Sequence, residues 1–206
     1  HLRPLHDAEI LTGRTAVLSV GSNRAPVQLH RKFGKNAVVP VTPATLHDCD
    51  IVHVAMLGYY GAVPCTAFPS LGCHVRLNVA WLDADQLAEM HRTEAVGIAY
   101  DYVRFTDAAV THLDFPEADG YRVPADTPLF GYSARAGVLD IGDGIPAALP
   151  VITAEGRQFS AFTQAEAVTF VRRLCQHNDA RDHASFVADM RQDKLARDTI
   201  REVLSA

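Results

Sequence analysis

Apolar residues recur along the chain with two different periods, which predict strands in its earlier part and helices at its end. Thr15 to Val20 is a β-branched apolar run typical of a central strand. Pro26 to Phe33 carries apolar residues at roughly helical spacing and is followed by Gly34, so it predicts a short helix. Further strand signals cover residues 38–41, 44–57, 62–67 and 73–82, broken by the turn clusters GYYGAVP and FPSLGC.

The segment 73–82 shows the clearest strand pattern. Its odd-numbered residues from Val75 to Trp81 are apolar and alternate with His74, Arg76 and Asn78, so we expect the odd-numbered side chains to face the core. Strand signals return at residues 100–106 and 108–113 and in LFGYSA, after a hairpin-like excursion through residues 114–128.

Between these strands, LDADQLAEMHRTEAVG predicts a helix. It starts at Asp83, with Gln86 three positions later in a capping-box arrangement, and stops before Gly97. Met90 and Glu94 lie on one apolar stripe of this helix, so a carboxylate is placed among buried positions.

From Thr163 onward the pattern is helical. TQAEAVTFVRRLCQ has an apolar face, and Asp182 to Leu204 predicts a charged amphipathic segment on the outside. The order of strands, an inserted helix, strands and then helices predicts an α+β domain with a mostly antiparallel or barrel-like sheet. We expect an N-terminal arm at residues 1–14, one domain at 15–160 and a C-terminal helical extension at 161–206 packed on it.

Composition narrows the functional classes. With 206 residues and 48% hydrophobic content, the chain is long enough for a substantial globular core. Its 19 basic and 24 acidic residues form no basic cluster, so nucleic acid is not expected as a partner. The sequence has no apolar run of membrane-spanning length and no signal-peptide pattern, which favours a cytoplasmic protein without a membrane partner.

Cysteine and histidine spacing favours neither a metal nor another cofactor. The four cysteines are scattered and predict buried or half-buried thiols, although Cys65 and Cys73 on neighbouring strands leave a disulfide open. The ten histidines show no H-x-x-x-H spacing. The stretch HDCDIVH, from His47 to His53, fits a polar strand edge better than a ligand cluster.

The turn LSVGSNRAP, from Leu18 to Pro26, has two interpretations. It is either an ordinary strand-to-helix turn, in which Ser22 or Asn23 caps the helix, or a cradle of main-chain N–H groups for a ligand oxygen.

Glu94 also has two interpretations. Burial on the stripe and the negative end of the helix dipole are both expected to raise its pKa toward the range useful for acid–base catalysis. Alternatively, the side chain lies at the edge of the stripe or reaches an arginine such as Arg92 or Arg104. Taken together, N–H donors and a desolvated carboxylate suffice for an intramolecular acyl transfer.

Several motifs, in order, resemble the γ-glutamylcyclotransferase-like family. LSVGSNRA is similar to the YGSN loop that opens these proteins, and YYGAVPCTAFPSLGCHVRLNVAWLDADQLAEMHRTE to the next block, which ends at the catalytic glutamate. YDYVRF and LFGYSA are similar to later strands that carry tyrosines, so the resemblance covers about residues 15 to 135. It implies a small mixed or antiparallel β-barrel with flanking helices and a cavity beside the first loop.

The resemblance also implies a reaction and a site. Family members cleave γ-glutamyl amides by attack of the substrate's own α-amine, which gives 5-oxoproline and releases an amine. Glu94 would move the proton, without a cofactor or metal. The implied substrate-binding residues are Gly21, Ser22, Asn23, Tyr60, Gly61, Tyr102 and Tyr132.

Three positions depart from the family pattern. Val20 replaces the usual aromatic residue before GSN, His91 replaces an aspartate, and Ala95 replaces a glycine. A non-catalytic module on the same fold, binding a small molecule or a protein partner, is therefore the alternative.

Overall fold

The computed structural model describes residues 8–106, 109–112, 123–124, 126–175 and 182–204. Two compact units divide the chain: residues 1–50, 69–135 and 154–157 form the first, and residues 51–68, 136–153 and 158–206 form the second. The domain boundaries expected after residues 14 and 160 stay predictions, because compactness alone does not define an independently folding domain.

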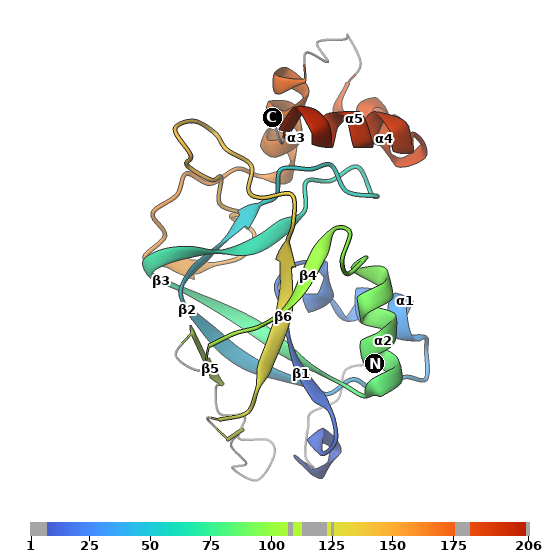
Figure 1. The fold of residues 1–206 in the computed structure, drawn as a ribbon, viewed down its shortest axis with the longest axis vertical. Helices are drawn as coiled ribbons and strands as arrows, with labels where there is room; N and C mark the ends of the chain where they lie inside the picture. Colours follow the sequence, from blue (N-terminus) through green and yellow to red (C-terminus); the bar gives the residue numbers. More distant parts are fainter. Residues whose placement is uncertain (1–7, 107–108, 113–122, 125, 176–181, 205–206) are drawn as a thin grey trace. The chain divides into compact units, whose positions relative to one another are not determined.

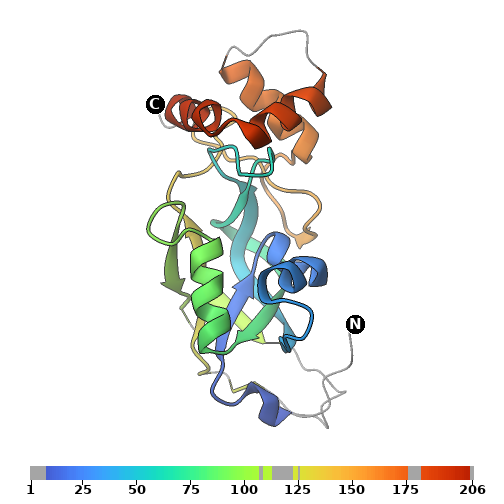
Figure 2. The ribbon, with the colours of Figure 1, turned by 90° about the vertical axis from the view of Figure 1, so that its right-hand side faces the viewer.

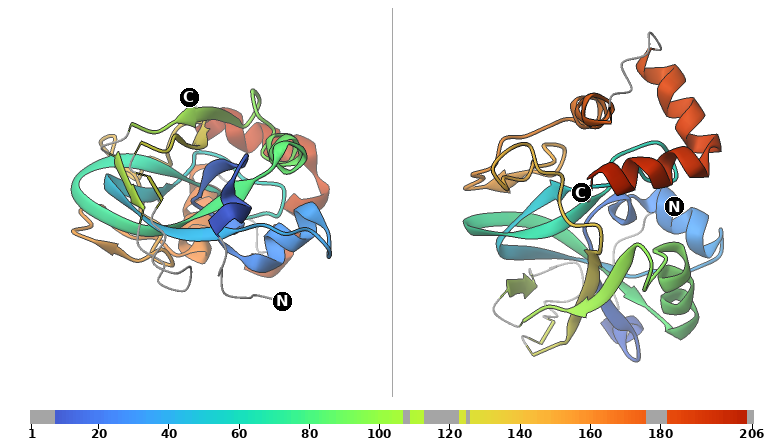
Figure 3. Two further views of the ribbon diagram at one scale, coloured as in Figure 1. Left: turned by 90° about the horizontal axis from the view of Figure 1, so that it is seen from below. Right: turned by 45° about the horizontal axis from the view of Figure 1, so that its top comes forward.

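The strands form one mixed sheet that is curled into a half-barrel (Figure 3). Their order is β4-β6-β1-β3-β2-β5, with β7 paired to β3. β1 is parallel to β6 and antiparallel to β3. The α+β class with C-terminal helices is therefore confirmed. The bounds are β1 (Thr15–Ser19), β2 (Val41–His53), β3 (Cys65–Leu82), β4 (Tyr100–Arg104), β5 (Val110–His112), β6 (Leu129–Ala134) and β7 (Ala154–Glu155).

Two helices lie beside the sheet of the first unit, as Figures 1 and 2 show: α1 (Pro26–Phe33) and α2 (Ala84–Thr93). The capping box predicted at Asp83 and Gln86 is present in full and sets the start of α2. Both helices bury their apolar stripes against the sheet in a cluster that includes Val17, Leu29 and Met90.

The predicted break at FPSLGC is wrong, because β3 runs without interruption through it. Pro69 is exposed, and a proline is tolerated in a strand where no N–H is required. Gly72 has a φ of +78°, and its N–H donates to Asp48 Oδ1 at 2.7 Å. A glycine thus absorbs the local distortion inside the strand, and the expected turn does not form.

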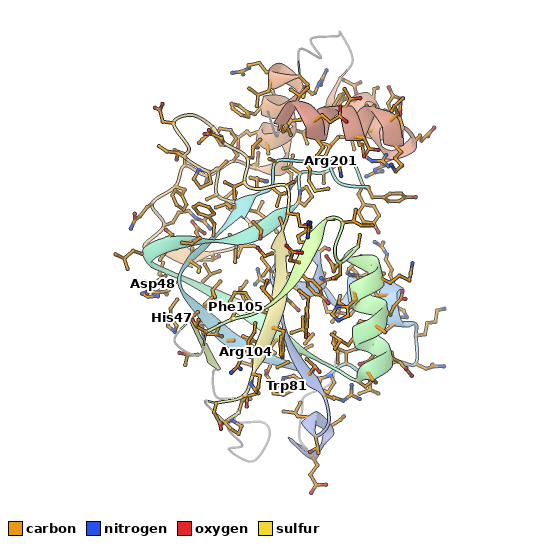
Figure 4. All side chains as sticks on the ribbon, viewed as in Figure 1. His47, Asp48, Trp81, Arg104, Phe105 and Arg201 are labelled. Carbon is orange, nitrogen blue, oxygen red and sulfur yellow. The ribbon has the colours of Figure 1, made fainter. Side chains whose placement is uncertain are left out.

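The alternation predicted for the rest of β3 is confirmed. Val75, Leu77 and Val79 are buried, whereas Arg76 is exposed. Trp81, labelled in Figure 4, is also buried and donates from Nε1 to Thr42 Oγ1 at 2.9 Å.

Residues 8–14 of the expected N-terminal arm are packed on the first unit. The 3-10 helix η1 (Ala8–Leu11) buries Leu11. Arg14 Nη1 donates to the Trp81 carbonyl at 3.2 Å and to Gln86 Oε1 at 3.0 Å. The segment predicted as an excursion, residues 114–128, lies mostly outside the described residues.

The second unit has its own core, formed around α3 (Gln164–Leu174), α4 (His183–Gln192) and α5 (Lys194–Leu204). The single segment expected over 182–204 is instead two helices, because Asp193 adopts extended backbone between them. Phe186 and Ile200 are fully buried there, so α4 and α5 do more than cover an outside face.

All four cysteines are free, so the disulfide left open by the sequence does not form. Cys73 is buried and the other three are half-buried, as predicted. Within the described residues, no helix combines the length and apolar character needed to cross a membrane.

Candidate active site

The Glu94 carboxylate meets the turn that follows β1. Glu94 is the C-cap residue directly after α2, and Asn23 lies in the 3-10 helix η2 (Ser22–Arg24), which leads into α1. Asn23 Nδ2 donates to Glu94 Oε1 at 3.0 Å. A carboxylate only accepts hydrogen bonds, so the amide NH₂ faces it. Two residues selected separately from the sequence are thus in direct contact.

A third residue, Lys32 of α1, completes this cluster. Its Nζ forms an ion pair with Glu94 Oε1 and lies 3.2 Å from Met90 Sδ. The side chains are mostly withdrawn from solvent, with 6% of Lys32 and 17% of Glu94 exposed. The sequence offered an arginine such as Arg92 or Arg104 as an alternative partner, but Arg92 binds Glu89 at 2.7 Å and the cation at Glu94 is Lys32. The pair therefore balances a charge that burial would otherwise destabilise.

Both donors converge on Oε1, and other polar atoms of the cluster have no partner in the described part of the chain. Among the residues described, none donates to Glu94 Oε2, and Asn23 Oδ1 is buried without a hydrogen-bond partner. The main-chain N–H groups of Gly21, Ser22 and Asn23 likewise donate to no acceptor in that part of the chain.

The turn itself is a single 3-10 turn between β1 and α1. The Gly21 and Ser22 carbonyls accept from the N–H groups of Arg24 and Ala25. The N-cap of α1 is Ala25, without a side-chain hydrogen bond, so the expectation that Ser22 or Asn23 caps the helix is wrong. The Asn23 amide binds Glu94 instead of the helix.

Aromatic residues of the sheet lie near this carboxylate. The Tyr132 hydroxyl of β6 is 3.0 Å from His91 Nδ1 of α2, and the Tyr102 ring of β4 packs against His91 with centroids 4.5 Å apart. Burial, the negative charge of Glu94 and the neighbouring Tyr102 raise the pKa of Tyr132. Burial alone raises the pKa of Tyr102 to about 12. Both phenols are therefore neutral donors at physiological pH.

Tyr60 and Gly61 belong to the second unit, and their proposed role at the substrate stays a prediction. The Tyr60 carbonyl accepts a hydrogen bond from Arg191 Nε at 2.8 Å. Gly61 has a φ of +70°, and a Cβ there would lie 2.8 Å from the Val187 carbonyl oxygen. Glycine is thus required at this position by backbone conformation and close packing.

The sequence analysis missed Lys32 and the contacts of His91. Lys32 follows the buried Leu29 by three residues, which places its cation on the inward face of α1. That position was the available signal, because a cation on a buried face needs a carboxylate partner. His91 was noted only as a departure from the family pattern, and nothing in the sequence paired it with Tyr132.

HDCDIVH forms no single cluster. His53 is fully buried and contacts the Phe162 carbonyl through Nε2 at 2.7 Å. Asp50 pairs with Arg157 at 2.8 Å. His47 is half-buried, and its Nδ1 is 3.1 Å from His74 Nδ1.

No protein-family model matches the chain, and no curated protein is significantly similar to it. A solved structure of a gamma-glutamyl cyclotransferase is similar at a TM-score of 0.44 and 17% identity, covering 58% of this chain and 65% of that one. An uncharacterized protein from Homo sapiens gives 0.45 and 17%, covering 60% and 69%. A protein from Arabidopsis thaliana gives 0.42 and 15%, covering 60% and 70%.

One of these three structures carries the name of the family that the sequence motifs resemble. At such low TM-scores and identities they carry no information about the reaction, which rests on the residues of this chain.

Proposed function

We propose that the protein is a γ-glutamylcyclotransferase-like enzyme that converts a small γ-glutamyl amide into 5-oxoproline and an amine. The observation that carries this proposal is the hydrogen bond from Asn23 Nδ2 to Glu94 Oε1. It holds a mostly buried carboxylate beside a turn in which the N–H groups of Gly21, Ser22 and Asn23 have no main-chain acceptor among the described residues. A proton carrier and oxygen-binding donors are the parts that this acyl transfer requires.

The proposed reaction starts at Glu94 Oε2, which takes a proton from the α-ammonium group of the substrate. The free amine attacks the γ-carbonyl carbon, a C–N bond forms, and negative charge develops on the carbonyl oxygen. N–H groups of Gly21, Ser22 and Asn23 stabilise that charge. Glu94 then gives this proton to the leaving nitrogen, whose bond to the carbonyl carbon breaks as the C=O double bond re-forms. The ring nitrogen still carries one extra proton, which Glu94 takes and passes to the released amine, so that the amine departs as an ammonium ion. The reacting groups belong to one molecule, so their encounter needs no second reactant.

Lys32 and Asn23 have a supporting role in this mechanism. Because both bind Oε1, they fix the orientation of the carboxylate and leave Oε2 for the substrate. The phenols of Tyr102 and Tyr132 remain protonated and form polar positions beside the site.

One observation favours the second candidate, a non-catalytic binding or interaction module. The ion pair with Lys32 already compensates the charge of Glu94, as a purely structural carboxylate would require. In that case the cluster stabilises the junction of η2, α1 and α2 and takes no part in proton transfer.

A panel of γ-glutamyl amines and γ-glutamyl amino acids distinguishes the two candidates, with release of 5-oxoproline as the readout. We expect turnover of at least one substrate by the wild-type protein and a loss of about 10²-fold or more in Glu94→Gln. Glu89→Gln is the matched control, because Glu89 lies on the same helix and pairs with Arg92. Equal turnover by wild type and folded Glu94→Gln would refute the mechanism, and no turnover on the whole panel would favour the module.

A further inference from the structure

His47 and His74 form a polar pair on the solvent side of the sheet, away from the Glu94 cluster. Their Nδ1 atoms are 3.1 Å apart, and the two rings meet edge to face with centroids 5.1 Å apart. Figure 4 labels His47 on β2 beside Asp48. Both histidines are half-buried, and their strand neighbours Leu46 and Val75 point into the core. The imidazoles are therefore held by the sheet yet remain accessible.

The hydrogen bonds around this pair place one unprotonated nitrogen and one N–H between the rings. His47 Nε2 lies 2.9 Å from Thr111 Oγ1 of β5. When that nitrogen carries the proton and donates to the hydroxyl, Nδ1 of His47 is unprotonated and accepts from Nδ1–H of His74. Thr111 thus selects the tautomer and the ring orientation of His47. In metal sites, the hydrogen-bond partner of a histidine's other ring nitrogen has this same effect.

We propose that His47 and His74 form a binding site for a divalent transition-metal ion of the imidazole-preferring class, such as Zn²⁺ or Cu²⁺. Two nitrogens bound to one ion at about 2.0–2.1 Å are about 2.8 to 3.4 Å apart for bond angles between 90° and the tetrahedral angle. The observed separation of 3.1 Å falls inside that range. On binding, the Nδ1 proton of His74 is replaced by the ion and moves through solvent to Nε2, so the ring stays neutral.

The surroundings define what kind of site this is. Among the described residues, no group of three or more His, Cys, Asp or Glu side chains is arranged to hold one ion. The remaining coordination positions therefore belong to water or to a small external ligand, which makes the site open rather than closed. Glu155 of β7 lies directly opposite His74 in the register of β3 and β7 and contributes negative charge on the same face.

Competition against a chromophoric chelator, using the untagged full chain and Zn²⁺, tests the proposal. We expect one ion per chain in the wild-type protein and a loss of about tenfold or more in affinity for His47→Gln and for His74→Gln. His30→Gln is the matched control, because His30 is exposed on α1, and it should bind as the wild type does. Thr111→Val keeps both ligands but removes the outer partner, so its affinity should fall by a smaller factor.

Two further measurements keep the test independent of any variant's folding. In NMR spectra of the wild-type protein, the first additions of Zn²⁺ should shift the imidazole resonances of His47 and His74 before those of other histidines. Mg²⁺ should not displace Zn²⁺, because Mg²⁺ prefers oxygen ligands to imidazole nitrogen. Wild-type affinity in the double variant His47→Gln/His74→Gln, or first shifts at other histidines, would overturn the site.

Discussion

Substitution of Lys32 and Glu94 by uncharged residues, singly and together, probes the ion pair at the centre of the candidate site. Lys32→Met leaves a carboxylate that is 17% exposed with only the Asn23 amide as partner. Glu94→Gln keeps an acceptor for Asn23 but leaves an ammonium on a side chain that is 6% exposed. Each single change removes the charge compensation of the other group, whereas the double change removes both charges and fills the space with similar volumes.

Removal of one partner from a buried pair costs about 3–5 kcal/mol. Partial exposure of Glu94 and its remaining hydrogen bond reduce that cost, so we expect about 2–3 kcal/mol for each single variant. For a chain of this length that corresponds to a fall in Tm of about 5–10 °C. Replacement of a pair by uncharged residues is often neutral, so the double variant should lose about 1 kcal/mol or less.

Urea unfolding of the four proteins gives the coupling energy directly. A double-mutant coupling of about 3 kcal/mol or more is the expected result. Additive losses, with the double variant less stable than either single one, would show that the two groups do not compensate each other, and the reasoning about the pair would be wrong. Arg92→Met, which breaks an exposed pair with Glu89, is the control and should change stability by less than about 1 kcal/mol.

Three further predictions concern other positions. Burial lowers the pKa of His53 below its ordinary 6.5, so the unfolded chain takes up the proton first. The contribution of His53 to the free energy of unfolding is therefore complete above pH 6.5 and is lost as the pH falls from 6.5 through the lower pKa of the folded protein. Unfolding curves at several pH values should show this loss of stability. His53→Gln should make the free energy of unfolding depend less on pH. Gly61→Ala should lose about 1–3 kcal/mol, measured by urea unfolding, because its Cβ would approach the Val187 carbonyl at a positive φ; wild-type stability would contradict this. Tyr132→Phe removes the hydroxyl bound to His91 and should lower the unfolding free energy by about 1 kcal/mol; no change would mean that the contact contributes nothing.

The parts of the fold that follow local rules were predictable from the sequence. α1 has the predicted bounds, because Pro26 suits the first helical turn and Gly34 follows the last residue. α2 begins after Asp83, since the capping box is a local device. The long course of β3 was not predictable in this way: Pro69 and Gly72 read locally as turn residues, and strand pairing overrides that preference.

The candidate site shows the same division between local and distant contacts. Glu94 was identifiable because a carboxylate on an apolar stripe conflicts with its surroundings, and the structure places it against Asn23 of the predicted turn. Lys32 was not identified, because the partner of a buried cation lies 62 residues away and no local pattern links them. Tyr60 and Gly61 came from the family resemblance, which gives a position in a motif but no contact.

The most direct test of the central proposal compares 5-oxoproline release by Lys32→Met with release by the double variant Lys32→Met/Glu94→Gln. Both proteins lack the ion pair, and Lys32→Met is expected to be the less stable of the two, so a loss of turnover in the double variant would not come from destabilisation. We expect Lys32→Met to retain turnover and the double variant, folded by circular dichroism, to lose about 10²-fold or more. Equal turnover by the two proteins would contradict a role for Glu94 in proton transfer.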